Sequence, residues 1–503
     1  MLENFVENFQ LGLHVFFHWP NILAVFIGVT AGIFIGAIPG LTATMSVALL
    51  VPITFKMNPV AGLAMLIGVY KGGIYGGSIT AILINTPGTP AAAATALDGY
   101  PLAKKGKGLK ALKMAIYASV MADTFSDIVL ILVAAPLAII ALKLGPPELT
   151  TLLILALTIV ALVSGKSLVK GLLVASLGLL FSSVGMDFMT GTTRFAFGSL
   201  EMTKGLPLIP VLIGLFAIPE ILVQVEEKVR GAESVVLKRS LRAEDNRVDF
   251  QELKGCSKTI FRSAIVGTFI GAIPGIGSVI SSFISYGMAK RGSKNPEEFG
   301  AGSLEGVAAA EAGNNAVCGA TLIPLLTLGI PGDSVTAVML GAFLIQGLVP
   351  GPELIGKHPD VIYGIFVALI IGNIANFMIA NAGIRLFARV ASISKNIVFP
   401  IVSILCVVGS YAIQNSLFDV KTMLFFGILG YCMRKLDFPI PPFLIAFILG
   451  PMVEEPLRQS LVVSGGSFAI FFSSPISLTF IILTGLSIFT LAWRRMKGGP
   501  SGP

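Results

Sequence analysis

Charged residues are scarce in this chain: Asp, Glu, Lys and Arg make up only 12% of its 503 residues. A typical soluble domain carries about 25% charged residues, so this chain cannot cover the surface of a soluble fold. Long stretches lack charge altogether, and each exceeds the roughly 20 residues that cross a bilayer as a helix. These stretches are residues 8–55, 72–97, 263–289, 361–384, 396–418 and 459–493. The scarcity of charge excludes a cytosolic enzyme and a nucleic-acid-binding protein, and it predicts an all-α polytopic membrane protein.

Histidine and cysteine, the usual ligands of transition metals, are also scarce. The four cysteines, Cys256, Cys318, Cys406 and Cys432, are widely separated, and three histidines, His14, His18 and His358, are too few for a convincing metal cluster. Because no Cys-x-x-Cys pair occurs, the sequence supports neither a zinc site nor a redox motif. We therefore expect no metal, no cofactor and no catalytic residues.

The charge that is present is distributed unevenly. Residues 224–262 contain 16 of the 62 charged residues and separate two apolar halves of similar length. We interpret residues 1–223 as a first membrane repeat, residues 224–262 as a charged cytoplasmic connector, and residues 263–503 as a second membrane repeat with a C-terminal helix. The net charge of +8 fits a membrane protein, because Lys and Arg gather in cytoplasmic loops. The first apolar run lacks a preceding basic segment, so we expect no cleaved signal peptide.

Sequence repeats link the two halves. The heptapeptide Phe-Ile-Gly-Ala-Ile-Pro-Gly begins at Phe34 in the first half and again at Phe269 in the second. Three prolines recur near the ends of the halves at a constant offset: Pro207, Pro210 and Pro219 match Pro439, Pro442 and Pro451. Internal duplication is typical of secondary transporters. The pattern predicts about 11–14 membrane helices in two pseudo-symmetric repeats; the alternative is a duplicated packing motif without a role in transport.

Loop charge indicates how the repeats are oriented. Five lysines crowd residues 104–113, whereas the corresponding loop at residues 351–360 is nearly neutral. The bias is opposite at another pair of loops, where the second half carries Lys290, Arg291 and Lys294. Opposite bias at equivalent loops favours inverted repeats, because positive loops face the cytoplasm. A third pair of loops is basic in both halves and fits this arrangement less well.

Four Pro-Gly pairs interrupt the apolar stretches and mark broken helices. They are Pro39-Gly40 and Pro87-Gly88 in the first half, and Pro274-Gly275 and Pro331-Gly332 in the second. Proline removes a backbone N–H and glycine relaxes the chain, and the freed groups must face protein or a water-filled cavity. The resulting half-helix N-termini attract carboxylates. The alternative is a set of kinks whose backbone groups are satisfied by neighbouring hydroxyls.

Small polar residues flank the breaks and are the candidates for binding a carboxylate substrate. The predicted substrate-binding residues are Thr42, Thr44, Asn85, Thr86, Thr89, Ser278, Asn314, Asn315 and Ser334, together with Lys71. Lys71 lies in an apolar, glycine-rich segment. A charged residue is unfavourable there, so its presence suggests a functional role. The alternative for Lys71 is a side chain that snorkels to a helix end.

Acidic residues near the breaks are candidates for binding a coupling ion. These are Asp98, Glu311 and Asp333. Glu311 could instead mark the interfacial end of a helix. Asp123 and Asp127, four residues apart, allow either a proton relay or a solvated helix end.

Six motifs in the chain resemble the large membrane subunit of the tripartite tricarboxylate transporter family. Six segments carry the resemblance: Gly36-Ala-Ile-Pro-Gly-Leu-Thr-Ala-Thr44, Tyr70-Lys-Gly-Gly-Ile-Tyr-Gly-Gly-Ser78, Asn85-Thr-Pro-Gly-Thr-Pro90, Asp98-Gly-Tyr-Pro101, Glu311-Ala-Gly-Asn-Asn315 and Gly329-Ile-Pro-Gly332. The motifs are long and specific, and the resemblance covers essentially the whole chain.

The resemblance implies a permease of the bacterial inner membrane that works with a small membrane subunit and a periplasmic solute-binding protein. The binding protein would deliver a carboxylate such as citrate or a dicarboxylate, and a Na⁺ or H⁺ gradient would drive uptake. The chain has no Gly-x-x-x-x-Gly-Lys-Ser/Thr nucleotide loop, which agrees with transport driven by ions. The alternatives are a stand-alone secondary ion or solute antiporter, a polytopic membrane enzyme and a structural scaffold.

Overall fold

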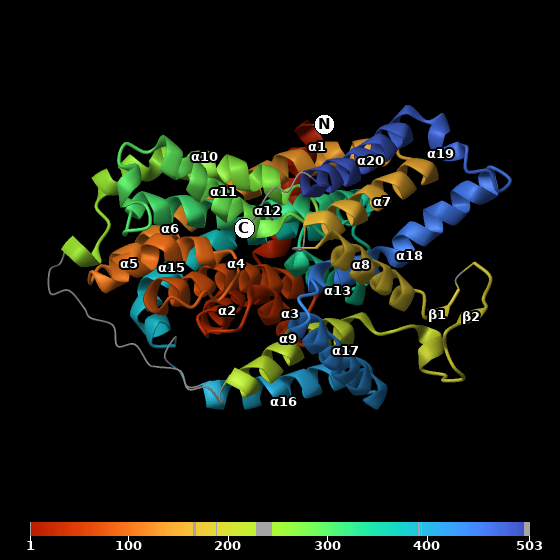
Figure 1. Ribbon diagram of the computed structural model, residues 1–503, viewed down its shortest axis with the longest axis horizontal. Helices are drawn as coiled ribbons and strands as arrows, with labels where there is room; N and C mark the ends of the chain where they lie inside the picture. Colours follow the sequence, from red (N-terminus) through yellow and green to blue (C-terminus); the bar gives the residue numbers. More distant parts are fainter. Residues whose placement is uncertain are drawn as a thin grey trace.

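The computed structural model describes residues 2–163, 167–187, 189–227, 244–390, 393 and 395–496. Within these residues the chain forms twenty α-helices, three short 3-10 turns and one two-stranded hairpin (Figure 1). This content confirms the predicted all-α class.

The helices before the connector are α1 (Leu2–Phe16), α2 (Trp19–Gly36), α3 (Ala43–Thr54), α4 (Pro59–Ile84), α5 (Ala92–Lys104), α6 (Gly108–Ala141), α7 (Pro146–Val163), α8 (Leu168–Ser182) and α9 (Leu208–Glu227). The helices after it are α10 (Phe250–Gly271), α11 (Gly277–Gly292), α12 (Leu304–Leu328), α13 (Ser334–Ile345), α14 (Pro352–Lys357), α15 (Pro359–Val390), α16 (Lys395–Gln414), α17 (Leu417–Lys435), α18 (Ile440–Val463), α19 (Ile470–Ser473) and α20 (Pro475–Met496). Strands β1 (Gly185–Met186) and β2 (Thr193–Arg194) pair antiparallel. The 3-10 turns are η1 (Met202–Lys204), η3 (Glu244–Asn246) and η4 (Pro296–Glu298).

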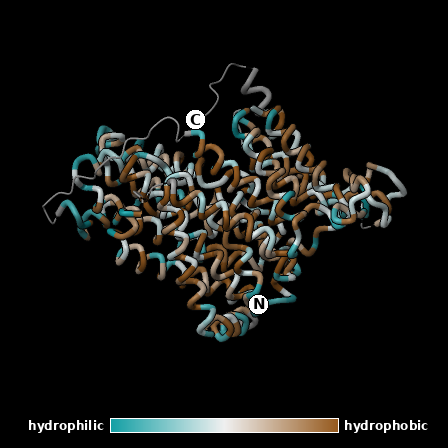
Figure 2. The backbone as a smooth tube through the Cα atoms, turned by 90° about the horizontal axis from the view of Figure 1, so that it is seen from below, coloured by the Kyte–Doolittle hydropathy of each residue, from teal (hydrophilic) through white to brown (hydrophobic). Residues whose placement is uncertain are grey.

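Seven of the described helices are long and apolar enough to cross a bilayer: α2, α4, α6, α9, α15, α16 and α18. Five shorter apolar helices accompany them, namely α3, α7, α8, α13 and α20. Along the chain the helices are made largely of hydrophobic residues, and many of the hydrophilic residues lie at loops and helix ends (Figure 2). The predicted 11–14 crossings therefore require shorter helices to cross as well, and that number stays a prediction.

Helices α2 and α4 pack so closely that their backbones touch. A Cβ atom on Gly32 would lie 2.4 Å from the carbonyl oxygen of Val69, and one on Gly36 would lie 2.4 Å from that of Gly73. Small residues permit this close approach between membrane helices. Residues 60–83 of α4 are all buried, so this helix forms the centre of the molecule.

Helices α4 and α12 are the central helices of the two halves, and they run antiparallel. The Tyr70 hydroxyl on α4 lies 3.4 Å from Thr321 Oγ1 on α12. Ser78, two turns further along α4, donates to Glu311, which precedes Thr321 by ten residues. Each of these helices ends just before a Pro-Gly break. Their antiparallel course is the arrangement that inverted repeats require.

Helix order is also similar in the two halves. Helices α2, α3, α4, α5 and α6 have 18, 12, 26, 13 and 34 residues. Helices α10, α11, α12, α13 and α15 have 22, 16, 25, 12 and 32 residues in the same order. This correspondence supports the repeat hypothesis, and the duplication itself stays a prediction.

Loops of one half contact loops of the other at both ends of the central helices. At one end, Lys105 Nζ donates to the carbonyl oxygen of Ala301 in the loop between α11 and α12 (2.8 Å). At the other end, Gln346 Nε2 donates to the carbonyl oxygen of Thr54 at the end of α3 (2.8 Å). The basic loop before α6 and the basic end of α11 therefore lie on the same face of the molecule.

We predict that this face is cytoplasmic, because positive loops face the cytoplasm. Lys105 and Arg291 are exposed. Each is replaced singly by cysteine in a background whose native cysteines are alanine. A membrane-impermeant thiol reagent applied to intact cells should label neither variant. The control is Lys357→Cys, which is exposed on α14 near the opposite loops and should be labelled. Labelling at Lys105→Cys or Arg291→Cys would contradict the predicted sidedness.

The charged connector is only partly described. Residues 228–243 lie outside the described residues, and residues 250–262 form the first half of α10. A capping box at Asp249 and Glu252 starts this helix. Ion pairs join Lys107 to Asp245 (3.5 Å) and Lys110 to Glu252, so the end of the connector lies beside the basic loop before α6.

The β1–β2 hairpin projects from the helices at the end where α8 and α18 lie (Figure 1). Arg194 forms a bidentate pair with Glu454 (2.8 and 3.1 Å), and Arg458 pairs with Asp187 (2.8 Å). Burial raises the pKa of Asp187, but the N–H groups of Thr190 and Met189 and the Arg458 guanidinium outweigh it, and the pKa falls to about 2. The hairpin therefore stays fastened to α18 at physiological pH.

Candidate functional site

A fully buried glutamate, Glu311 on α12, is the centre of a polar cluster. Its carboxylate accepts hydrogen bonds from Ser78 on α4 (2.6 Å), Thr95 on α5 (2.5 Å) and Ser119 on α6 (3.0 Å). The Asn315 amide, one turn along α12, donates to Ser119 (2.8 Å) and to the Glu311 carboxylate (3.3 Å). All five side chains are at most 1% exposed, and all four donors are neutral. We name these five residues the Glu311 cluster.

A second buried cluster surrounds Lys71 on α4. The Lys71 ammonium donates to Asp123 and Asp127 on α6, each at 2.7 Å, and to Asn373 on α15 at 3.1 Å. The Asn373 amide in turn donates to Asp127 (2.7 Å) and to Thr124 (3.1 Å). Lys71, Asp123, Asp127 and Asn373 are at most 2% exposed. We name these five residues the Lys71 cluster; in it, the predicted substrate-binding lysine already has two carboxylate partners.

The two clusters form one buried polar seam between the halves. Lys71 and Ser78 are seven residues apart on α4, roughly 10 Å along the helix, and Ser119 and Asp123 are one turn apart on α6. The seam contains three carboxylates and one ammonium, so full ionisation leaves a net charge of −2. A buried charge without a partner is unfavourable in a low dielectric. The seam therefore favours the uptake of protons or cations.

The Pro87-Gly88 break, after α4, folds the chain back on itself. Helix α4 ends at Asn85, whose φ of 53° is left-handed. The chain then returns along α4, and the Gly88 N–H donates to the carbonyl oxygen of Gly77 (3.1 Å). A Cβ atom on Gly88 would lie 2.7 Å from Gly77 Cα, so this return requires glycine. Helix α5 then runs forward again beside the end of α4, where Gly99 contacts Ile82.

The Pro331-Gly332 break, after α12, lies beside the Pro274-Gly275 break. The Gly275 N–H donates to the carbonyl oxygen of Gly332 (2.8 Å), so the two breaks of the second half touch. Asp333 then caps α13: its Oδ1 accepts from both the N–H and the hydroxyl of Thr336, each at 2.8 Å. Its Oδ2 accepts from the Tyr70 hydroxyl on α4 (2.8 Å). Asp333, a predicted coupling-ion ligand, thus joins the Pro331-Gly332 break to the central helix of the first half.

The Pro39-Gly40 break separates α2 from α3 through a left-handed glycine. Gly40 has a φ of +95°, which a side chain would strain. Thr42 then caps α3 by accepting a hydrogen bond from the Met45 N–H (3.2 Å). The predicted break thus coincides with a helix end.

Asp98 accepts three hydrogen bonds from the backbone of the other half. Its Oδ1 accepts from the N–H groups of Gly300 (2.8 Å), Gly302 (2.9 Å) and Ser303 (2.8 Å). Successive N–H groups of this kind stabilise an anion. The bonds fasten α5 to the loop before α12, which favours a positioning role for Asp98; its role as a coupling-ion ligand stays a prediction.

The residues predicted to bind substrate differ in exposure. Asn85 and Thr86 are exposed; Thr42, Thr44, Ser278 and Ser334 are half-buried; Lys71, Thr89, Asn314 and Asn315 are buried. The structure brings Glu311 and Asn315 together, whereas Lys71 lies in the separate cluster two turns along α4. Their roles in binding stay predictions.

Sequence reasoning did not single out Ser78, Ser119 or Asn373. A signal for two of them exists: Ser78 follows Lys71 by seven residues, and Ser119 precedes Asp123 by four. Both spacings place side chains on the same face of a helix. The proton relay considered for Asp123 and Asp127 remains open, but neither residue is a solvated helix end, since both are buried and paired with Lys71.

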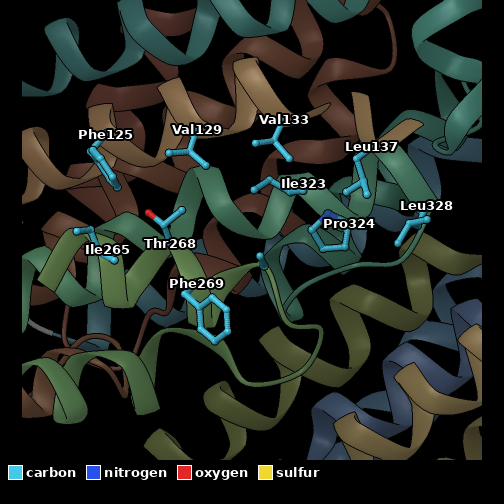
Figure 3. Close-up of a pocket in the computed structure, with 11 residues that line it drawn as sticks. Phe125, Val129, Val133, Leu137, Ile265, Thr268, Phe269, Ile323, Pro324 and Leu328 are labelled. Atoms are coloured by element: carbon cyan, nitrogen blue, oxygen red, sulfur yellow. The ribbon is translucent and has the colours of Figure 1, made fainter. Parts of the chain in front are cut away.

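An apolar pocket of about 440 Å³ lies between α6, α10 and α12 (Figure 3). Side chains of α6, among them Phe125, Val129 and Val133, line one side, and Ile265 and Phe269 of α10 line the other (Figure 3). Its lining is hydrophobic apart from the single hydroxyl of Thr268, so it lacks the several polar groups that a multiply charged carboxylate needs. The pocket is therefore not the candidate site for an anionic substrate.

Comparison with known proteins assigns the chain to a family. The family model described as "Tripartite tricarboxylate transporter TctA family" matches residues 22–445. An uncharacterized 52.8 kDa protein in the TAR-I ttuC' 3' region of Agrobacterium vitis is 37% identical over 491 residues, which cover 98% of this chain and 97% of that protein. An uncharacterized protein in the TAR-II ttuC' 3' region of the same organism is 40% identical over 226 residues, or 45% of this chain and 93% of that protein. No solved structure matches the chain. The chain therefore belongs to the TctA family of tripartite tricarboxylate transporters.

Proposed function

We propose that the chain is the large permease subunit of a binding-protein-dependent secondary transporter that imports tricarboxylates or related carboxylates. An ion gradient drives this uptake. The protein lies in the inner membrane of a bacterium, where a small membrane subunit and a periplasmic solute-binding protein complete the system. Membership of the family supports the transport of tricarboxylates, and the finer assignments are part of the proposal.

The observation that best supports transport is the pair of antiparallel helices α4 and α12, each followed by a Pro-Gly break. Broken helices at the interface between repeats are where secondary transporters bind substrate and coupling ions. Here the breaks adjoin a buried polar seam that contains both acidic and neutral groups. Among the described residues no cluster of three His, Cys, Asp or Glu side chains suits a metal ion, so nothing in that part of the chain favours a metalloenzyme.

The carboxylate substrate, in this proposal, binds at the breaks through neutral donors. Hydroxyl and amide groups bind an anion without a fixed positive charge, which allows both binding and release. Thr89 and Asn314 are buried, and Asn314 has no hydrogen-bond partner for either amide atom within the described residues. Lys71 contributes less directly to substrate binding, because Asp123 and Asp127 already neutralise its charge.

Uptake should collapse when the Na⁺ and H⁺ gradients are dissipated while ATP is maintained. The reason is that the chain lacks a nucleotide-binding loop, so the gradient is its energy source. The measurement is accumulation of radiolabelled citrate by cells that express all three components, with ionophores added and cellular ATP monitored. Accumulation that persists without either gradient would disprove ion coupling.

A stand-alone antiporter is the second candidate, because the buried acidic residues of the seam also suit ion exchange. Co-purification distinguishes the two. The tripartite proposal expects a small membrane protein to remain bound to the tagged chain in mild detergent. It also expects citrate uptake to depend on the periplasmic binding protein. Citrate uptake by the chain alone, without either partner, would favour the antiporter.

A further inference from the structure

The Glu311 carboxylate is buried without a cationic partner. It is 0% exposed, and within the described residues it forms no ion pair. The nearby Lys71 cluster does not compensate it, because Asp123 and Asp127 already outnumber Lys71. Four neutral donors stabilise the buried carboxylate, and a proton or a bound cation would neutralise it.

The groups around Glu311 suit a hard monovalent cation. The Ser78 and Thr95 hydroxyl oxygens lie 2.6 and 2.5 Å from Oε1, and the Ser119 hydroxyl lies 3.0 Å from Oε2. Carboxylate and hydroxyl oxygens are the ligands that hard cations prefer. Only one carboxylate contributes to this shell, so a single positive charge makes the site neutral.

Asn314 provides independent evidence that a hydrogen-bond partner is missing near the Glu311 cluster. It is 0% exposed, and neither its Oδ1 nor its Nδ2 has a hydrogen-bond partner in the described part of the chain. It lies one turn beyond Glu311 on the same side of α12. Buried side-chain amides normally form hydrogen bonds, so one that forms none indicates a missing partner.

The antiparallel course of α5 and α12 sets the turn of α12 that carries Asn314 level with the Pro87-Gly88 break. Helix α5 runs antiparallel to α12: Asp98 contacts Gly306, and Ser282 bridges the carbonyl oxygens of Ala91 and Ala310. Continuing in this direction, the next turn of α12, which carries Asn314, lies level with the break before α5. The Glu311 cluster and the Pro87-Gly88 break are therefore neighbouring parts of one site.

We propose that Glu311, with the hydroxyls of Ser78, Thr95 and Ser119, binds one monovalent cation, either a proton or Na⁺, and that this is the coupling ion. The inference rests on the proposed function. The site joins α12 of the second half to α4, α5 and α6 of the first. A bound cation neutralises Glu311 and stabilises this closed packing. Its release leaves a buried charge and favours an arrangement that admits water.

Glu311 is not the only titratable group on the surrounding helices, so the test must distinguish it from the others. Besides Glu311, the charged and titratable groups on these helices are Tyr70, Lys71 and Tyr75 on α4, Asp98, Tyr100 and Lys104 on α5, Lys110, Lys113, Tyr117, Asp123 and Asp127 on α6, Tyr286, Lys290 and Arg291 on α11, and Glu305 and Cys318 on α12. Lys71 is paired with Asp123 and Asp127, and Asp98 accepts three backbone bonds. A response to ions that depends on Glu311 is therefore separable from these groups by substitution.

The test compares Glu311→Gln with Glu305→Gln in the purified full-length chain. Glutamine keeps the size of the side chain but cannot take up a proton or supply a charge. Glu305, on the same helix, accepts from Thr259 (2.6 Å) and Ser293 (2.7 Å) outside the cluster and is the matched control. Thermal stability is measured in NaCl against choline chloride, and separately across a pH series.

A stabilisation by NaCl that is present in wild type and Glu305→Gln but lost in Glu311→Gln supports Na⁺ as the ligand. A pH dependence lost in the same selective way supports a proton. A wild-type protein that responds to neither condition, or a Glu311→Gln variant that keeps both responses, overturns the proposal.

Transport separates this proposal from the proposed function. In proteoliposomes with all three components, Glu311→Gln should lose gradient-driven accumulation of citrate but retain exchange of labelled for unlabelled citrate. Accumulation equal to wild type in Glu311→Gln overturns the coupling role. If the wild-type system moves no citrate or other carboxylate, the proposed function fails, while the stability test still decides whether Glu311 binds a cation.

Discussion

Replacing Lys71 with methionine should strongly destabilise the protein. Methionine has nearly the length of lysine, so the change removes the charge and leaves little cavity. Asp123 and Asp127 would then face each other without the ammonium that each contacts at 2.7 Å. Removing one partner of a buried ion pair costs about 3–5 kcal/mol. The expected result is a large fall in thermal stability or in the yield of folded protein, measured by size-exclusion chromatography after heating in detergent.

The matched control removes the stranded charges as well. The triple variant Lys71→Met, Asp123→Asn, Asp127→Asn should recover most of the lost stability, because no uncompensated carboxylate remains. If Lys71→Met were as stable as wild type but unable to transport citrate, Lys71 would act on substrate and the ion pairs would contribute little. Stability and transport measured on the same preparations therefore separate the two roles.

Lys71 shows what the sequence could and could not reveal. A lysine within a long apolar stretch was recognisable as exceptional, and the helix ends at the Pro-Gly pairs follow from the chemistry of proline and glycine. Its partners were not recognisable. Asp123 and Asp127 lie 52 and 56 residues away, and Asn373 lies 302 residues away. Contacts over such separations depend on how helices pack, which local patterns do not specify.

The Glu311 cluster illustrates the same limit of local patterns. Glu311 and Asn315 form a visible motif, but Ser78 is 233 residues away and looks like an ordinary small residue in a helix. Serines and threonines satisfy backbone carbonyls in many membrane helices, so their presence alone indicates no site. Only the antiparallel packing of α4 and α12 brings their hydroxyls to one carboxylate.

Charge density does not show where a helix begins inside the connector, for a clear physical reason. The high charge of residues 224–262 predicts a connector with some helix, and α10 begins within it at Phe250. The capping box at Asp249 starts the helix early, and its first turns carry charged residues that are exposed, such as Lys254 and Lys258. A helix that extends beyond the bilayer can carry charged residues, so a rise in charge does not mark the end of the helix.

Replacing Gly32 with alanine should separate α2 from α4 and destabilise the whole molecule. The added Cβ atom would lie 2.4 Å from the Val69 carbonyl oxygen, 2.8 Å from Gly73 N and 2.9 Å from Val69 Cα. These are backbone atoms of a buried helix and cannot move aside, so the two helices must part along their length. Overpacking a core costs about 1–3 kcal/mol and occasionally more, and here it also weakens the contacts of the central helix.

Gly287→Ala is the matched control for this substitution. Gly287 also lies in a helix, α11, and a Cβ atom there would meet nothing within 4 Å. Because alanine favours a helix over glycine by about 1 kcal/mol, this variant should be as stable as wild type or slightly more stable. Both variants are compared by the temperature at which half of the detergent-solubilised protein aggregates. Equal midpoints for Gly32→Ala and Gly287→Ala would show that α2 and α4 do not pack backbone to backbone, and the burial of the polar seam beside α4 would then lose its structural basis.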